Sequence, residues 1–300
     1  MLKPLSEKTL RKKYDNLGLP EEVTDLLHKY FLCFSNLYGM LSVREAWELF
    51  REYEGLGLVH KSEFYEFSEI AQRELQPYKI IDLDEIYKEE ENCSAGDRYI
   101  ITDFLILSGY YKFRVVWDLD STRNDDVPFY LPPKEELFQF TEDRFWKTKI
   151  AIKMKSFVEN LKSDGQCRSF TGGPLWDIKD VDGNSVTGKC AKDIVMFTRF
   201  EQYDVEHESR QLRKERLIAE YTRTVAEKIE HSIENNIMCG DLYWGPAKTI
   251  SYLIESMSNE YGVTMTMDQA QEFLNLYMEL NNTSNLWINW GWSPEKLGGF

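Results

Sequence analysis

Apolar residues recur at about every third or fourth position in three consecutive segments near the start of the chain, which predicts three helices. The first spans Pro20–Tyr38. The second follows Ser42, which can form a capping box with Glu45 three residues later. The third spans Glu63–Leu75, with Ser62 as its expected N-cap. The start of the chain is therefore expected to be a compact group of helices.

The pattern changes after Pro77, where two short extended segments replace the helical periodicity. Tyr78–Leu83 and Arg98–Thr102 are rich in β-branched and aromatic residues, and an acidic stretch with turn residues separates them. Three helices followed by a two-stranded hairpin form the outline of a winged helix. In that arrangement the hairpin is the wing, and Glu63–Leu75 has the position of the recognition helix.

A polar stretch over residues 118–126 interrupts the apolar pattern further along the chain. Pro128, Pro132 and Pro133 follow it, and this run of prolines predicts a linker. We therefore place a domain boundary at residue 131.

The boundary gives two expected domains. Residues 1–131 form an acidic winged-helix-like domain, and residues 132–300 form a mainly helical domain. The second domain contains a loop or hairpin at about 163–192, where Gly and Asp are frequent, and a Trp-rich element at its C-terminus. The predicted fold class is α+β, predominantly α. The helices expected in the second domain span 134–160, as one helix or as two that meet near Thr141, and 193–236, 246–261 and 267–281.

Composition places the chain among folded proteins. Hydrophobic residues make up 42% of the 300 residues and aromatic residues 14%, which excludes a disordered or low-complexity chain. No apolar run is long enough to span a bilayer, and the start has no signal-peptide pattern. The five cysteines are scattered without a C-x-x-C pair, which indicates reduced thiols and no zinc site. We therefore expect a cytoplasmic protein that does not contact membranes.

The distribution of charge argues against DNA binding by the expected winged helix. The chain has a formal net charge of −15, and residues 1–140 hold 17 basic and 27 acidic side chains, a net of −10. The charged residues of the expected recognition helix are mostly acidic, whereas a reader of the DNA major groove needs cations and amides. Affinity for DNA also depends on neutralising phosphates with Lys and Arg. Binding of a protein partner is therefore favoured over binding of nucleic acid.

Two groups of side chains are candidates for contact with such a partner. Acidic residues of the wing and linker can present an acidic surface or imitate DNA, and aromatic residues near the C-terminus can anchor a partner. The alternatives are a solvated acidic face and a structural Trp-rich cap. The candidate residues are Glu89, Glu90, Glu91, Asp118, Asp120, Asp125, Asp126, Trp287, Trp290 and Trp292.

A third group is a local cluster of cations in a charged helical stretch. It suits contact with nucleic acid or an acidic partner, and simple solvation of the helix is the alternative. The cluster comprises Arg210, Arg213, Lys214 and Arg216. The chain shows no nucleophile motif, phosphate-binding loop or metal-ligand spacing, so we predict no catalytic residues, no metal and no cofactor.

Three stretches carry a family resemblance: FSNLYGML at 34–41, FYLPPKEEL at 129–137 and NNTSNLWINWGWSPEKL at 281–297. They resemble the nLYGii signature, a junction and the NNTRLWxNxGHTPNEL element of an uncharacterised group of Firmicute proteins. Ser284 and Asn285 stand where that element has Arg, and Trp292 stands where it has His. Some members end in a SEC-C metal-binding motif, which this chain lacks. The resemblance implies a shared organisation and neither a zinc site nor an activity.

These features together predict a non-enzymatic protein that binds or regulates a protein partner through an acidic surface. A bacterial or phage accessory protein, such as an inhibitor of host defence, fits this description. The alternatives are a nucleic-acid-binding transcriptional regulator and an enzyme whose acidic site has no recognisable motif.

Overall fold

The computed structural model describes residues 4–87, 93–107, 113–142, 144–163, 178–180, 194–197, 224–240 and 245–298. The chain forms two compact units, of which residues 1–144 together with 285–300 form the first and residues 145–284 the second. The first unit is thus discontinuous in sequence. The expected boundary at residue 131 lies within it, and the Trp-rich element belongs to the first unit rather than to the second.

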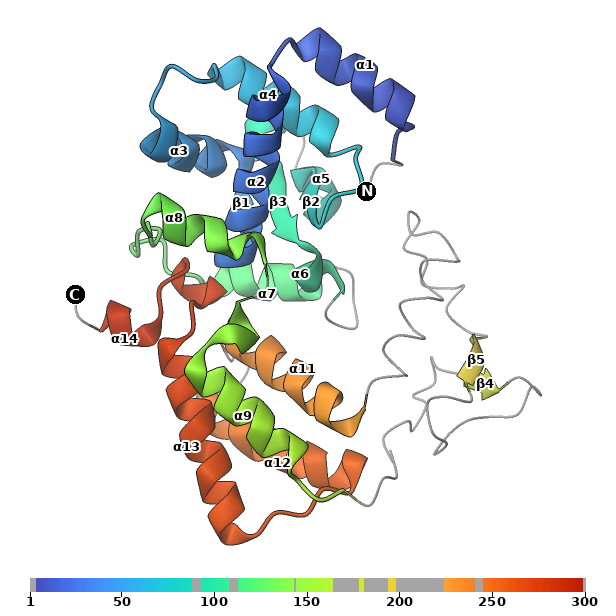
Figure 1. Ribbon diagram of the computed structural model, residues 1–300, viewed down its shortest axis with the longest axis vertical. Helices are drawn as coiled ribbons and strands as arrows, with labels where there is room; N and C mark the ends of the chain where they lie inside the picture. Colours follow the sequence, from blue (N-terminus) through green and yellow to red (C-terminus); the bar gives the residue numbers. More distant parts are fainter. Residues whose placement is uncertain are drawn as a thin grey trace. The chain divides into compact units, whose positions relative to one another are not determined.

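The first unit combines helices with a small sheet (Figure 1). Its 3-10 turns are η1 (Ala95–Asp97), η2 (Phe138–Thr141) and η6 (Trp287–Asn289). Its helices are α1 (Glu7–Leu17), α2 (Glu21–Tyr38), α3 (Val43–Glu54), α4 (Lys61–Ala71), α5 (Leu83–Ile86), α6 (Asp103–Leu107), α7 (Arg114–Thr122), α8 (Lys134–Leu137) and α14 (Pro294–Leu297).

Three short strands form an antiparallel sheet in the order β1–β3–β2. The strands are β1 (Met40–Ser42), β2 (Tyr78–Ile81) and β3 (Tyr99–Thr102). Both outer strands pair with β3, so that Ser42 and Ile81 lie on opposite sides of Tyr99. The two strands predicted from sequence are confirmed. The pairing of β1 with β3 was not predicted, because β1 is three residues long and its partner is distant in sequence.

Local capping signals explain where the early helices begin. Ser42 accepts from the backbone N–H of Glu45 and Glu45 accepts from that of Ser42, which confirms the predicted capping box. The expected N-cap of α4 was wrong. The helix begins two residues earlier, after His60, because Glu63 lies three residues beyond His60 and accepts a hydrogen bond from its backbone N–H at 2.7 Å. The helix also ends at Ala71, before the predicted Leu75.

The prediction that residues 118–126 are irregular was wrong for the first part of this stretch. Helix α7 runs through this stretch as far as Thr122, and it presents Val116 and Leu119 to the core. Arg123, which follows the helix, is buried as well. The apolar residues of the helix are Val115, Val116, Trp117 and Leu119, so the stretch from residue 120 onward carries no apolar signal that would reveal its last turn.

Aromatic side chains fill the core of the first unit. Phe31 of α2 lies at its centre, with ring centroids 5.2 Å from Phe64, 5.3 Å from Phe67 and 5.8 Å from Tyr78. Such edge-to-face pairs add about 0.5–1.5 kcal/mol each beyond the burial of their surface. These contacts hold α4 and β2 against α2, and so fix the position of the outer face of α4.

The second unit is a group of helices with a two-stranded ribbon. The strand β5 corrects the prediction of a helix over 193–236, because residues 194–197 are extended and pair with β4. Helices α12 and α13 confirm their predicted positions. The elements are η3 (Phe145–Lys147), α9 (Lys149–Glu159), β4 (Ile178–Asp180), β5 (Ile194–Phe197), α11 (Val225–Met238), α12 (Pro246–Tyr261) and α13 (Met267–Thr283).

Two polar contacts join α11 to the elements before it. Glu230, which is buried, pairs with Lys155 of α9 at 3.2 Å, and the Trp146 indole donates to Glu234 at 3.0 Å. A buried carboxylate is tolerated when a cation compensates it, so this pair also fixes the register of the two helices. The described residues are mostly helical with a small antiparallel sheet, which confirms a predominantly α form of α+β fold.

Candidate functional site

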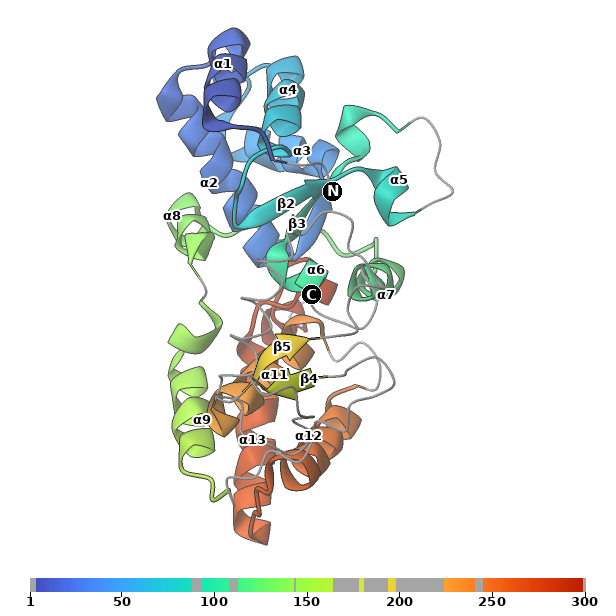
Figure 2. The same cartoon turned by 90° about the vertical axis from the view of Figure 1, so that its right-hand side faces the viewer.

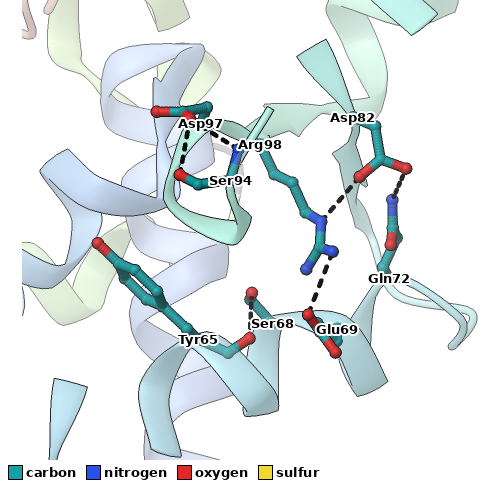
Figure 3. Close-up of polar contacts among 8 residues, drawn as sticks. All are labelled: Tyr65, Ser68, Glu69, Gln72, Asp82, Ser94, Asp97 and Arg98. Carbon is teal, nitrogen blue, oxygen red and sulfur yellow. Dashed lines mark hydrogen bonds and ion pairs between the residues drawn. The ribbon is translucent and has the colours of Figure 1, made fainter. Parts of the chain in front are cut away.

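The side of α4 that faces the β2–β3 pair is bound to it through Arg98 (Figure 3). The Arg98 guanidinium donates from Nε to Asp82 Oδ1 at 2.7 Å and from Nη2 to Glu69 Oε1 at 3.3 Å. Gln72, the C-cap residue of α4, donates to the other oxygen of Asp82 at 2.9 Å. Arg98 Nη1 is buried without a hydrogen-bond partner in the structure. The Arg98 cation therefore binds carboxylates of the fold itself.

The turn η1 packs on the same helix. Asp97 accepts hydrogen bonds from the backbone and hydroxyl of Ser94, and these bonds are the main reason that the pKa of Asp97 is lowered. Arg44 of α3 pairs with Asp97 from the other side. A Cβ atom on Gly96 would lie 2.8 Å from the Tyr65 hydroxyl, so glycine permits the close approach of η1 to α4.

The outer face of α4, which we define as Ser62, Glu66 and Glu69, is exposed and acidic, and Glu69 lies at its edge, where it also pairs with Arg98. Lys61 at the start of the helix lies over the Tyr65 ring, with its ammonium 5.4 Å from the ring centroid. Because it is negatively charged, the outer face of α4 repels phosphate groups and attracts Lys and Arg side chains of a protein.

Arg123 joins the Trp-rich element to α2 and β1. Its guanidinium donates to the backbone carbonyls of Trp287, Met40 and Tyr38, at 3.0 Å for Trp287 and 2.7 Å for Met40. It also lies over the ring of Trp290. Three carbonyls and an aromatic face together solvate a cation that water does not reach.

Burial lowers the pKa of Arg123 to about 10, and the negative charges of Glu45 and Asp120 oppose this decrease. The guanidinium therefore stays charged at neutral pH. Tyr87 donates a hydrogen bond to Asp120, and burial is the main reason that the pKa of Tyr87 is raised. These residues have a structural role, because they bind one another and the backbone.

The three C-terminal tryptophans lie within the first unit. Each indole donates to a backbone carbonyl of that unit: Trp287 to Asn36 at 2.9 Å, Trp290 to Asn124 at 3.0 Å and Trp292 to Pro128 at 2.9 Å. Trp287 and Trp290 are buried, with 4% and 9% of their surface exposed. The structure thus places these side chains where they close a core.

The predicted acidic candidates occupy different positions. Asp118 and Asp120 lie on α7 and are partly buried, whereas Asp125 and Asp126 are exposed in the turn that follows Arg123. The remaining predicted residues lie outside the described part of the chain. They are Glu89, Glu90, Glu91, Arg210, Arg213, Lys214 and Arg216.

His28, for which the sequence predicts a partly buried position on a helix, connects α1, α2 and β2, and 18% of its side chain is exposed. Tyr14 donates to Glu74 at 2.6 Å, and its hydroxyl lies 3.0 Å from His28 Nε2. The Tyr78 hydroxyl lies 2.6 Å from His28 Nδ1. Because the Tyr14 proton goes to Glu74, His28 Nε2 donates to Tyr14, and Nδ1 accepts from Tyr78. Burial lowers the pKa of His28 and so favours this neutral form, although Glu74 opposes it.

Helix α1 carries a basic face that the sequence prediction missed, because the helix itself was not predicted. Lys8, Arg11 and Lys12 are exposed at the spacing of one helix face. The signal was present in Ser6, which caps the helix, followed by Leu10, Tyr14 and Leu17 at helical spacing.

Within the described residues, no group of three or more His, Cys, Asp or Glu side chains is arranged to hold a metal ion. Among the helices of the same residues, none has both the length and the apolar character needed to cross a membrane.

Comparisons with known proteins find nothing similar: no family model matches the chain, and neither a curated protein nor a solved structure does.

Proposed function

We propose that this chain is a non-enzymatic binding protein whose first unit is an acidic winged-helix-like domain that contacts a protein partner. The order α2–β1–α3–α4–β2–β3, with the sheet order β1–β3–β2, supports the winged-helix assignment. In that arrangement α4 has the position of the recognition helix, and the segment between β2 and β3 has that of the wing.

The charge of the outer face of α4 carries the proposal. Glu66 is exposed there, and Glu69 keeps 53% of its side chain exposed although it pairs with Arg98. A DNA reader needs donors and cations on this face, and phosphates would instead meet carboxylates. A protein surface with Lys or Arg gains complementary charge at the same place, which raises the rate of association and favours the correct partner.

The test is photo-cross-linking of the full chain in cells that produce it. A benzophenone amino acid replaces Glu66 on α4, and the matched control replaces Glu52, which is exposed on α3. We expect a cross-linked product from position 66 that protease degrades and nuclease leaves intact, and little product from position 52.

A nuclease-sensitive product from position 66, or equal products from both positions, would overturn the proposal. In the same series, fluorescence anisotropy measures binding of the purified chain to a labelled DNA duplex at about 50 mM salt, where electrostatic binding is strongest. We expect no binding. Salt-sensitive binding to the duplex would support the nucleic-acid-binding alternative instead.

A further inference from the structure

Helix α1 provides a positive surface in a unit that is otherwise acidic. Its basic face consists of Lys8, Arg11 and Lys12, all exposed, and Asp15 lies on the same face. Three cations and one carboxylate give this face a net charge of +2. Among the described residues, no carboxylate lies within ion-pair distance of the three cations.

Helix α1, which carries the basic face, packs beside α4, which carries the acidic face. Figures 1 and 2 both show the two helices side by side. The backbone N–H of Leu5, just before α1, donates to the carbonyl of Arg73, just after α4, at 2.9 Å. The rings of Tyr14 and Phe67 lie 6.0 Å apart between the helices. The apolar side of α1 thus packs against α4, and the cations of α1 are exposed to solvent.

An exposed leucine accompanies this pair of charged faces. Leu75 follows α4 two residues after the carbonyl that binds Leu5, and 75% of its surface is exposed. Ion pairs at a surface contribute little affinity, whereas an apolar side chain that becomes buried can anchor an interface. The region around the two helices therefore offers both kinds of contact.

We propose that the first units of two copies of this chain associate about a two-fold axis, with α1 of each copy against α4 of the other. A two-fold axis places α1 of one copy opposite α4 of the other, and α4 of the first opposite α1 of the second. A surface with a basic helix beside an acidic helix is therefore complementary in charge to a second copy of itself. This proposal rests on the proposed function in one respect, because both require that a protein binds the outer face of α4. A nucleic acid fits this surface poorly, since phosphates attracted by Lys12 would approach Glu66.

Symmetry determines how the association responds to charge and salt. Every contact occurs twice, so one substitution changes two contacts in the dimer. The charged side chains are exposed, and salt therefore screens their attraction over about 10 Å at 0.1 M ionic strength. The dimer is consequently weak and salt-sensitive, and it forms at high chain concentration.

Sedimentation velocity of the full chain at increasing concentration, in about 50 mM and about 500 mM salt, tests the proposal. We expect the sedimentation coefficient to rise with concentration at low salt and to rise less at high salt. Lys12→Glu and Glu66→Lys are each expected to weaken the association about ten-fold or more. The combined variant again places opposite charges at positions 12 and 66, and we expect its association to return to within about three-fold of the original chain.

Two further variants complete the experiment. Glu52→Lys on α3 changes the net charge as Glu66→Lys does and is expected to leave association unchanged, because it lies on another helix. Leu75→Ser is expected to weaken association while its salt dependence remains. A monomer at every concentration in low salt, or failure of the combined variant to recover, would overturn the proposal. A cross-link from position 66 to a different protein would still support the proposed function in that case, so the two failures are distinguishable.

Discussion

The guanidinium carbon of Arg123 lies 4.1 Å from the centroid of the Trp290 ring. Trp290 has a φ of 52°, which is uncommon for a bulky residue, and its backbone carbonyl accepts from the N–H of Tyr130 at 3.0 Å. The cation, the ring and the strained backbone thus lie at one point, where the end of α7 meets the C-terminal segment.

Replacement of Arg123 by Met should destabilise the first unit by about 3 kcal/mol or more, because three buried carbonyls lose their donor. Arg123→Lys should be nearly as harmful, since one ammonium cannot reproduce three separated bonds and the stacking. Urea unfolding measures both. Arg51→Met is the control, because Arg51 pairs with Glu48 at the surface of α3 and its loss should cost less than about 1 kcal/mol. Equal effects of the Arg123 and Arg51 variants would contradict this account.

Gly39 requires glycine for two reasons. Its φ is 75°, and a Cβ atom would lie 2.6 Å from Trp287 Cγ. Gly39→Ala should therefore lower the free energy of unfolding by about 3 kcal/mol or more, because strain and overpacking add. Gly18 has the same φ with no atom within 4 Å of such a Cβ, so Gly18→Ala should cost only about 1–2 kcal/mol. If thermal unfolding gave the two variants the same loss, the fit against Trp287 would not matter.

Stability should fall on acidification because of His28. The ordinary pKa of the group is 6.5, and burial lowers the pKa in the folded state. Below pH 6.5 the unfolded chain therefore binds a proton that the folded chain does not, so the free energy of unfolding decreases as the pH falls. This group contributes at most about 1.4 kcal/mol per pH unit.

His28→Gln isolates this contribution. We expect the variant to be less stable than the original chain at pH 7, because Tyr14 and Tyr78 lose their partner, but to lose less stability between pH 7 and pH 5. His60→Gln controls for the removal of an exposed imidazole. Urea unfolding at several pH values makes the comparison, and parallel pH profiles for the original chain and His28→Gln would refute the assignment.

Arg98 should matter more than its neighbour Arg44. Arg98 is largely buried and joins α4 to β2 and β3, so Arg98→Met should cost about 1–3 kcal/mol by leaving Asp82 and Glu69 without their cation. Arg44 is exposed and pairs with Asp97 alone, and Arg44→Met should cost less than about 1 kcal/mol. Hydrogen exchange of α4 provides a second measure, since loss of Arg98 should speed exchange there. Unchanged exchange would mean that the ion pairs do not hold the helix.

The parts of the fold that depend on neighbouring residues could be predicted from the sequence. Ser42 with Glu45, and Thr266 with Gln269, mark helix starts because their hydrogen bonds span three residues. The error at α4 has the same origin, since Ser62 is a good cap by type but has Tyr65, not an acid, three residues later.

The interactions that join distant segments could not be predicted. Nothing near Arg123 in the sequence indicates that it binds the carbonyls of Tyr38 and Trp287, because those partners come from opposite ends of the chain. The aromatic C-terminal element was recognisable, but its place in the first unit depends on indole hydrogen bonds to carbonyls such as that of Asn36. The excess of acidic residues in α4, by contrast, could be predicted from its composition alone.

The return of residues 285–298 to the first unit also sets the order in which the protein can be completed. A ribosome that adds about 5–20 residues per second needs on the order of ten seconds to pass from residue 145 to residue 284. Throughout that interval Arg123 and the carbonyls of Tyr38 and Met40 lack the tryptophans that cover them. The half of the protein that is synthesised first is therefore the half that finishes folding last.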